Sequence, residues 1–275
     1  MTAASVGERS PGIAYSEEAS PLSSAKAILS ERVKDYSARI FDAADVMGMQ
    51  ALIPRLIIQY NLDELTPNPR VKLQGNHVVM DLPFLFLVRA EDAAPDSEIY
   101  KLMKQRLSGH VLTEREQRDL IAFQKFVQNP RMAERAKTFT LYHELAHVLH
   151  GDILTCCGHT ESCSREKRAD LTAAEYSGDA EAGIYLFNIL NMYSPITTRI
   201  THPLFQERVD YLSDYLVSKA AESLDALSLE SDAIPATSGE MALATVLLPV
   251  ATPETDATAD LEGGDMGLNA LFVQA

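Results

Sequence analysis

Apolar residues recur at helical spacing along most of this chain, and this pattern predicts a mainly helical protein. The first periodic segment covers residues 24–61, where we expect one or two helices, with Pro54 kinking or breaking the second. The period changes over residues 71–88, where β-branched and aromatic residues gather around Gly75 and Asn76. That segment predicts a hairpin or two sheet strands. The predicted fold class is therefore α+β, mainly α, with a small sheet.

Local end signals place the helices of the second half. Thr113 and Glu116 have the spacing of a capping box, which opens one helix. Asn129 and Pro130 stop that helix and begin the next, whose pattern runs unbroken to Gly151. Three further helices are predicted near residues 164–176, 183–193 and 203–224.

The two ends of the chain differ in composition from the middle. Residues 1–22 are small and polar and show no period, so we expect disorder there. The net charge is −15, and residues 221–275 contain ten Asp and Glu but no Lys or Arg. The other 220 residues carry about −5, which is unremarkable. We therefore expect one domain over residues 23–220 and an acidic, disordered tail over residues 221–275.

Charge and hydropathy disfavour several classes of partner. No basic stripe offsets the acidic charge, so we expect no nucleic-acid partner. No segment approaches the roughly 18 continuous apolar residues of a membrane helix, so we expect no membrane association. The first residues lack the basic start and apolar core of a secretory signal, which makes the cytoplasm the expected location.

Three of the seven histidines lie with a glutamate inside residues 143–150. His143 and His147 are four residues apart, so a helix places both on one face, where two imidazoles can hold one metal ion. Glu144 projects beside them toward the water that the ion would activate. Hydrolysis needs three protein ligands and an open position, so the pattern predicts one Zn²⁺ per chain with a third ligand elsewhere.

The third ligand is predicted in a charged helix downstream. Glu166 follows His147 by 19 residues, and Asp170 lies one turn later on the same face. The carboxylate of Asp170 can accept the free ring N–H of a liganding histidine and so determine its tautomer. Glu161 and Glu175 remain alternatives for the ligand, although neither has an acidic residue four positions on in a helical setting.

Two other groups near the histidine pair are expected to play no part as ligands. His150 and Ile153 occupy the positions where a metzincin has Gly and His, so that continuation is absent and His150 is expected to be a neighbour of the site. The loop residues Cys156, Cys157 and Cys163 surround His159, but the paired CxxC halves of a zinc knot are missing. We expect an idle thiol cluster there.

The segments HELAHVLH (143–150) and ExxAD…AAE (166–175) resemble the ImmA/IrrE-type metallopeptidases. They are also similar to the HtpX-type family, in which a THP…ER segment follows, as THPLFQER does here at 201–208. Lit-type phage-exclusion peptidases are a third relative. The resemblance covers about residues 133–216 and implies a zincin-like domain of gluzincin type, with the small sheet beside the active-site helix. It implies that His143, His147 and Glu166 bind Zn²⁺ and that Glu144 is the general base.

The expected function is zinc-dependent hydrolysis of peptide bonds in a protein or peptide substrate inside the cell. The resemblance implies a regulatory, stress or phage-defence role. The alternative is a zinc-binding regulatory protein whose site is silent or conditionally activated, although an intact Glu144 disfavours loss of turnover.

His202 is a further catalytic candidate, because a donor near the metal can stabilise the oxyanion of the tetrahedral intermediate. A packing or capping role at the start of its helix is equally open. Three tyrosines could fill the same catalytic role: Tyr142, Tyr176 and Tyr193.

Overall fold

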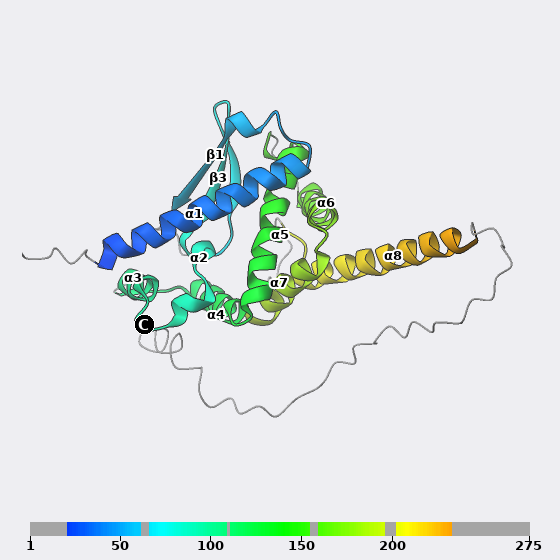
Figure 1. Ribbon diagram of the computed structural model, residues 1–275. Coiled ribbons are helices and arrows are strands. Elements are labelled where there is room, and N and C mark those ends of the chain that lie inside the picture. The colour runs from blue at the N-terminus through cyan, green and yellow to red at the C-terminus, as the bar shows by residue number, and fades with distance from the viewer. Residues whose placement is uncertain (1–20, 62–65, 109–110, 155–158, 196–201, 233–275) are drawn as a thin grey trace, which may run out of the picture.

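The computed structural model describes residues 21–61, 66–108, 111–154, 159–195 and 202–232, and it is mainly helical with a small mixed sheet (Figure 1). This arrangement confirms the predicted α+β, mainly α class. The helices of these segments are α1 (Pro21–Val46), α2 (Phe84–Leu87), α3 (Glu98–Leu107), α4 (Glu114–Val127), α5 (Pro130–Leu149), α6 (His159–Ser177), α7 (Ala180–Tyr193) and α8 (Phe205–Asp232). The strands are β1 (Leu56–Asn61), β2 (Arg70–Gln74) and β3 (His77–Pro83).

The sheet has the order β1-β3-β2, so β3 is central and β2 is an edge strand. β2 and β3 pair antiparallel and form the predicted hairpin. Gly75 in its turn has φ +60°, a left-handed conformation that favours glycine. Because β2 is at the edge of the sheet, one side of this strand is free of a partner strand, and β2 contacts α5.

The helical prediction for the end of residues 24–61 is wrong, because Leu56–Asn61 forms the strand β1. Its residues pair parallel with β3, from Leu56 opposite Val78 to Asn61 opposite Pro83. A short apolar run can form either a helix or a strand, and here the exposed edge of β3 provides the hydrogen-bond partners. The strand region predicted to reach residue 88 ends at Pro83, because residues 84–87 form the single helical turn α2.

The predicted helix starts of α4 and α5 are confirmed. Thr113 and Glu116 form a capping box in which each side chain accepts from the backbone N–H of the other residue. The side chain of Asn129 accepts from the N–H of Met132, and Pro130 occupies the first turn of α5, where a missing N–H costs nothing. These local interactions begin the helix that carries the histidine pair.

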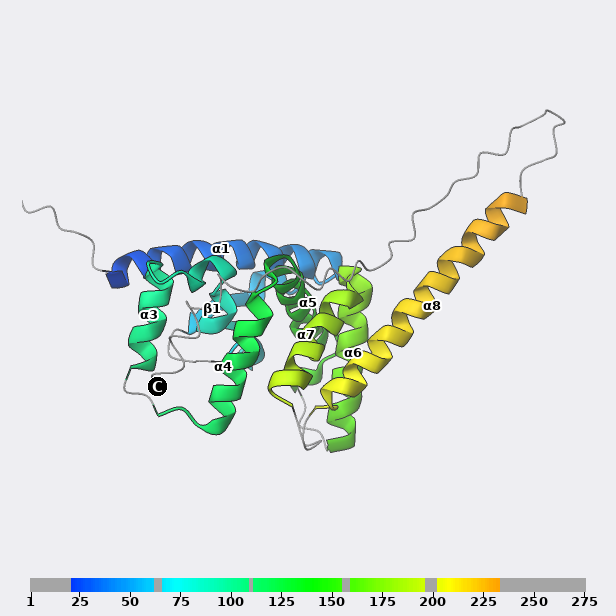
Figure 2. The same cartoon turned by 90° about the horizontal axis from the view of Figure 1, so that it is seen from below.

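Helix α5 stands at the centre of the body, while α1 spans its length (Figures 1 and 2). α5 contacts α1, α6, α7 and β2. Phe139, Leu145 and Ala146 of α5 are almost completely buried. On α6, Ala169, Ala173 and Ala174 are buried as well, and such short side chains allow two helices to approach closely. The close packing of α6 on α5 brings the predicted third ligand toward the histidines.

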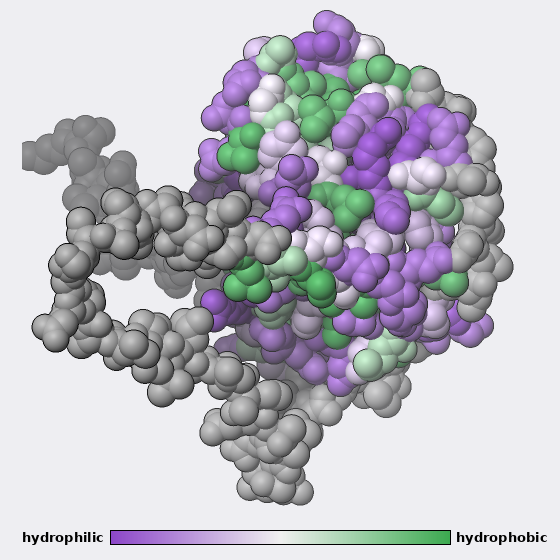
Figure 3. Space-filling model, turned by 90° about the vertical axis from the view of Figure 1, so that its right-hand side faces the viewer, coloured by the Kyte–Doolittle hydropathy of each residue, from purple (hydrophilic) through white to green (hydrophobic). Residues whose placement is uncertain are grey.

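Helix α8 continues to Asp232, past the domain boundary expected at residue 220. Its first half packs on α6 and α7, and its second half projects from the body (Figures 1 and 2). Leu224 on the second half is 67% exposed, and Val217 near the end of the first half is 70% exposed. On the side of the body that lies to the right in Figure 1, hydrophobic residues are interspersed with hydrophilic ones (Figure 3). Residues 1–20 and 233–275, most of the two predicted disordered segments, lie outside the described residues.

None of the helices in the described segments combines the length and apolar character needed to cross a membrane.

Gly183 is expected to tolerate no side chain, because α7 touches α5 and α8 at this point. A Cβ there would lie 2.7 Å from Phe139 Cζ and 2.9 Å from a methyl carbon of Leu212. Gly183→Ala should therefore lower the free energy of unfolding by about 1–3 kcal/mol, the usual cost of overpacking a core. Chemical denaturation measures this value. In a Phe139→Leu background the same substitution should cost clearly less, and equal costs in both backgrounds would contradict the proposed clash.

Candidate metal centre

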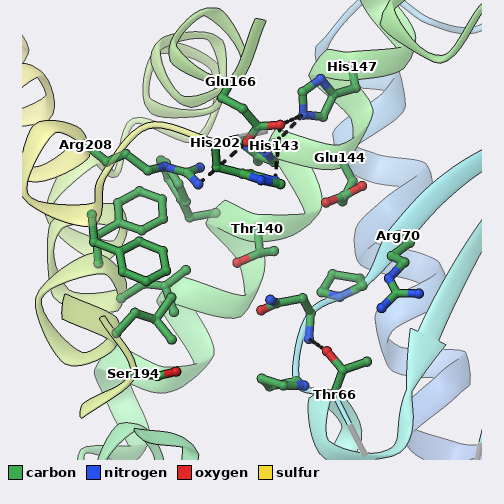
Figure 4. A pocket seen from close by; sticks show the side chains of 18 of the residues that line it. Thr66, Arg70, Thr140, His143, Glu144, His147, Glu166, Ser194, His202 and Arg208 are labelled. Atoms are coloured by element: carbon green, nitrogen blue, oxygen red, sulfur yellow. Dashed lines mark hydrogen bonds and ion pairs between the residues drawn. The ribbon is translucent and has the colours of Figure 1, made fainter. Parts of the chain in front are cut away.

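The structure brings His143, His147 and Glu166 together, and these three residues form a group that could bind a metal ion (Figure 4). One potential ligand atom from each lies within 4.8 Å of the other two. The two Nε2 atoms are 3.1 Å apart. The carboxylate oxygens of Glu166 lie 3.4 Å from Nε2 of His143 and 3.4 Å from Nε2 of His147. The predicted ligand set thus converges from α5 and α6.

Both imidazole rings are oriented by carboxylates on their other nitrogen. Nδ1 of His143 lies 2.8 Å from Oδ1 of Asp170, and Nδ1 of His147 lies 3.1 Å from Oδ2 of Asp152. Carboxylates at these distances favour a proton on Nδ1, which leaves Nε2 with a lone pair directed at the centre of the group. Asp170 therefore lies where the sequence predicted it, next to a histidine of the pair.

The three residues fit a metal cation. Two Nε2 lone pairs facing each other at 3.1 Å repel unless a proton or a cation lies between them. Oε2 of Glu166 is buried without a hydrogen-bond donor, which is costly for a carboxylate oxygen. Imidazole nitrogens and a carboxylate are the ligands of catalytic zinc sites, at about 2.0–2.2 Å from the ion. A cation would satisfy all three groups at once.

The charges around the group attract positive charge. Burial by itself would lower the pKa of His143, but Asp170 and Glu166 outweigh it and raise that pKa to about 10. Burial acts to raise the pKa of Glu166, but the adjacent rings of His143 and His147 lower it well below its usual range. Without a cation the group therefore retains a proton, and a bound metal ion would take its place.

Asp170 is completely buried and is held by α8. Its two carboxylate oxygens accept from Nε and Nη2 of Arg208 at 2.7 and 2.6 Å, and the hydroxyl of Tyr211 donates to it as well. Burial opposes ionisation of Asp170, but Arg208 and then His143 keep its pKa below the usual value. The guanidinium of Arg208 also stacks on the ring of Phe187, 3.9 Å from its centroid. The first half of α8 thus supports the ring of His143 through Asp170.

Glu144 follows His143 on α5 and lines the same pocket as the three potential ligands (Figure 4). Its side chain does not belong to the metal-binding group. Oε2 accepts a hydrogen bond from the backbone N–H of Val71 in β2 at 3.0 Å. Burial raises the pKa of Glu144, while the nearby histidines oppose that rise. Glu144 thus presents a carboxylate beside the group that could bind a metal ion.

The pocket is a cleft of about 800 Å³ between the sheet and the helices α4 to α8. A volume of this size is within the range of sites that hold ligands of several hundred daltons. The metal-binding group lies at one part of its wall, and α7 provides an apolar part with Leu186, Phe187 and Leu190. The segment 66–69 and the start of β2 form the opposite side.

His202 also lines this cleft, with Nε2 3.5 Å from Oε1 of Glu166 (Figure 4). Its side chain is 46% exposed, so it lies at the margin of the site. The other predicted candidates lie elsewhere. His150 contacts the Thr172 hydroxyl at 2.9 Å and does not belong to the metal-binding group. The remaining alternatives do not line the cleft: Glu161, Glu175, Tyr142, Tyr176 and Tyr193.

The sequence interpretation missed three contributors to the site. Asp152 lies directly after the glycine that ends the α5 segment, and this position was the only sequence signal for it. Arg208 belongs to the THPLFQER segment, but nothing local indicated that it would bind Asp170. Val71 contributes a backbone N–H, for which no side-chain pattern exists. Cys163 is half-buried on α6, while Cys156 and Cys157 lie outside the described residues.

A comparison with models of known protein families, with curated proteins and with solved structures gives no match for this chain.

Asp152 is expected to contribute to metal affinity although it is not a ligand. It orients His147, and it also pairs with Arg168 on α6. Asp152→Ala should weaken metal binding by roughly 10–100-fold, as is usual when the partner of a liganding histidine is removed. Competition with a chromophoric chelator measures this change. Arg168→Gln removes this ion pair but leaves the contact with His147 and the ion pair of Asp152 with Arg165. It should therefore retain the affinity of the unmodified protein, and an equal loss in both variants would assign the effect to the Arg168 ion pair.

Proposed function

We propose that this protein is a zinc-dependent peptidase that uses His143, His147 and Glu166 as metal ligands and Glu144 as general base. The observation that carries the proposal is the convergence of two Nε2 atoms and one carboxylate beside a second carboxylate in one cleft. Two histidines with one glutamate make up a known ligand set of catalytic zinc, which leaves a coordination position open. The resemblance of the HExxH and ExxAD segments to metallopeptidases supports the same assignment.

The cleft supports a peptide as the substrate class. Its walls combine apolar side chains of α7 with charged groups near the potential ligands. An extended polypeptide presents this mixture of apolar side chains and polar amide groups. The cleft is also large enough for more than one residue of such a chain.

A bound zinc ion supplies Lewis acidity, which activates water and polarises a carbonyl group. The residues of the chain perform the remaining tasks. An oxygen of the Glu144 carboxylate takes a proton from the attacking water and passes it to the amine that leaves. Because burial raises the pKa of Glu144, its carboxylate binds that proton more readily than an exposed one would. His202 is placed at the margin of the cleft, where its ring could donate to the developing oxyanion.

Metal analysis together with a peptidase assay tests this function. The purified protein should contain one zinc per chain and should cleave peptides from a fluorogenic library or an unfolded protein such as casein. A chelator should remove both the zinc and the cleavage, and added Zn²⁺ should restore both.

Bound zinc without any cleavage would favour the regulatory alternative. The protein can also be purified without chelators and then incubated with Zn²⁺. If it contains no zinc after this treatment, the proposal as a whole is contradicted.

A further inference from the structure

The edge strand β2 makes a contact with Glu144 that the ligand geometry does not require. In an antiparallel ladder, successive residues direct their backbone groups alternately toward the partner strand and away from it. Within the described segments β2 pairs with β3 alone, so its outward backbone groups face the side on which α5 packs. Val71 is one of the outward residues, and its N–H donates to Oε2 of Glu144 at 3.0 Å.

Among the described residues, the side chain of Glu144 makes no hydrogen bond other than this one. Figure 4 shows Glu144 extending from α5 into the pocket on the side where Arg70 of β2 lies. A glutamate has three rotatable side-chain bonds, so a carboxylate without such a partner would populate several positions. One donor on a rigid strand removes most of that freedom for one oxygen and leaves the other oxygen available to the cleft.

We propose that the backbone N–H of Val71 is a positioning group that holds the general base Glu144 in its productive place. This inference rests on the peptidase function proposed above. Proton transfer requires the base within hydrogen-bond reach of the attacking water, and a misplacement of about 1 Å can cost about 10²-fold in rate. The sheet, which contributes none of the three potential ligands, thereby contributes to the chemistry.

The hydrogen bond to Glu144 comes from the backbone N–H of Val71 and not from its side chain. Substitutions by proline, which has no N–H, therefore test the proposal directly. Val71→Pro removes the N–H, and proline is tolerated in edge strands where the N–H faces outward. Leu73→Pro places the same proline two residues along, at the next outward-facing N–H of β2, and Leu73 does not line the cleft.

Val71→Pro should lower kcat by roughly 10–100-fold while KM and zinc content stay close to those of the unmodified protein. Leu73→Pro should keep kcat within about twofold. An unchanged kcat in Val71→Pro overturns the inference, and so does an equal loss in Leu73→Pro, which would show a general effect on the strand. If Val71→Pro does not fold, Val71 can be replaced with the α-hydroxy acid that carries the same side chain, which removes only the N–H. The same fall in kcat is expected for that protein, and an unchanged kcat would overturn the inference.

Hydrogen exchange of the Val71 amide tests the contact without any turnover. Glu144→Ala should accelerate exchange at Val71 by roughly tenfold, the effect of losing one hydrogen bond, and should leave the amide of Leu73 unchanged. Unchanged exchange at Val71 overturns this inference and leaves the peptidase proposal intact. A chain that binds zinc but cleaves nothing would instead overturn the peptidase function, and the positioning role with it, even if the exchange result is as expected.

Discussion

Replacing Glu144 with Gln is expected to remove peptidase activity while the protein stays folded and loaded with zinc. The amide cannot take a proton from water, so kcat should fall by roughly 10²–10⁴-fold, the contribution typical of a general base. The amide oxygen can still accept from the N–H of Val71, so the local structure should persist. The free energy of unfolding should not fall, because burial already disfavours the charged form of Glu144.

Three measurements on one preparation check this expectation. Initial rates on the best library peptide give kcat, metal analysis gives the zinc content, and thermal unfolding gives the melting temperature. Glu175→Gln makes the same chemical change at an exposed position of α6 and should match the unmodified protein in all three. Cleavage by Glu144→Gln at the rate of the unmodified protein would remove Glu144 from the mechanism.

Replacing Glu166 with Gln is expected to reduce zinc binding more than any other single change on α6. The carboxylate is nearly buried, and its pKa is held low by the two histidines, so it supplies the negative charge of the ligand group. The neutral amide removes that charge and leaves an NH₂ group in a space that fits an acceptor. Affinity should fall by more than about 10²-fold, since partners of liganding residues alone contribute 10–100-fold.

A zinc-buffer titration measures this affinity. Glu161→Gln is the matched control, because Glu161 lies on the same helix but its side chain is 60% exposed and pairs with Arg165. That variant should bind zinc as the unmodified protein does. Full zinc content in Glu166→Gln at limiting free zinc would show that another acidic residue completes the ligand set.

The parts of the fold that were predictable from sequence depend on residues close together in the chain. The capping box of Thr113 and Glu116 and the cap at Asn129 act within one turn of helix. The residue types at these positions are therefore enough to predict where α4 and α5 begin. The hairpin around Gly75 is equally local. The four-residue spacing of His143 and His147 specifies a shared helix face once the helix is given, so the pair was predictable too.

The segment after Pro54 shows where local reasoning fails. Its apolar residues suit a helix or a strand, and the choice of strand depends on β3, which follows Asn61 by more than a dozen residues. The length of α8 was underestimated for a related reason. Residues 217–224 of this helix are all exposed, so the spacing of apolar residues was a poor guide to where the helix ends.

The sequence by itself determined that this chain is mainly helical, that one helix carries two histidines with a glutamate between them, and that a later helix presents Glu166 with Asp170. Only the tertiary structure decided how these groups meet. The buried alanines of α6 bring Glu166 to the histidines, α8 holds Asp170 through Arg208, and β2 donates a backbone N–H to Glu144. Such contacts join residues far apart in sequence, and one of them uses a backbone group that every residue except proline possesses. A pattern of neighbouring residues in the sequence therefore cannot predict these contacts.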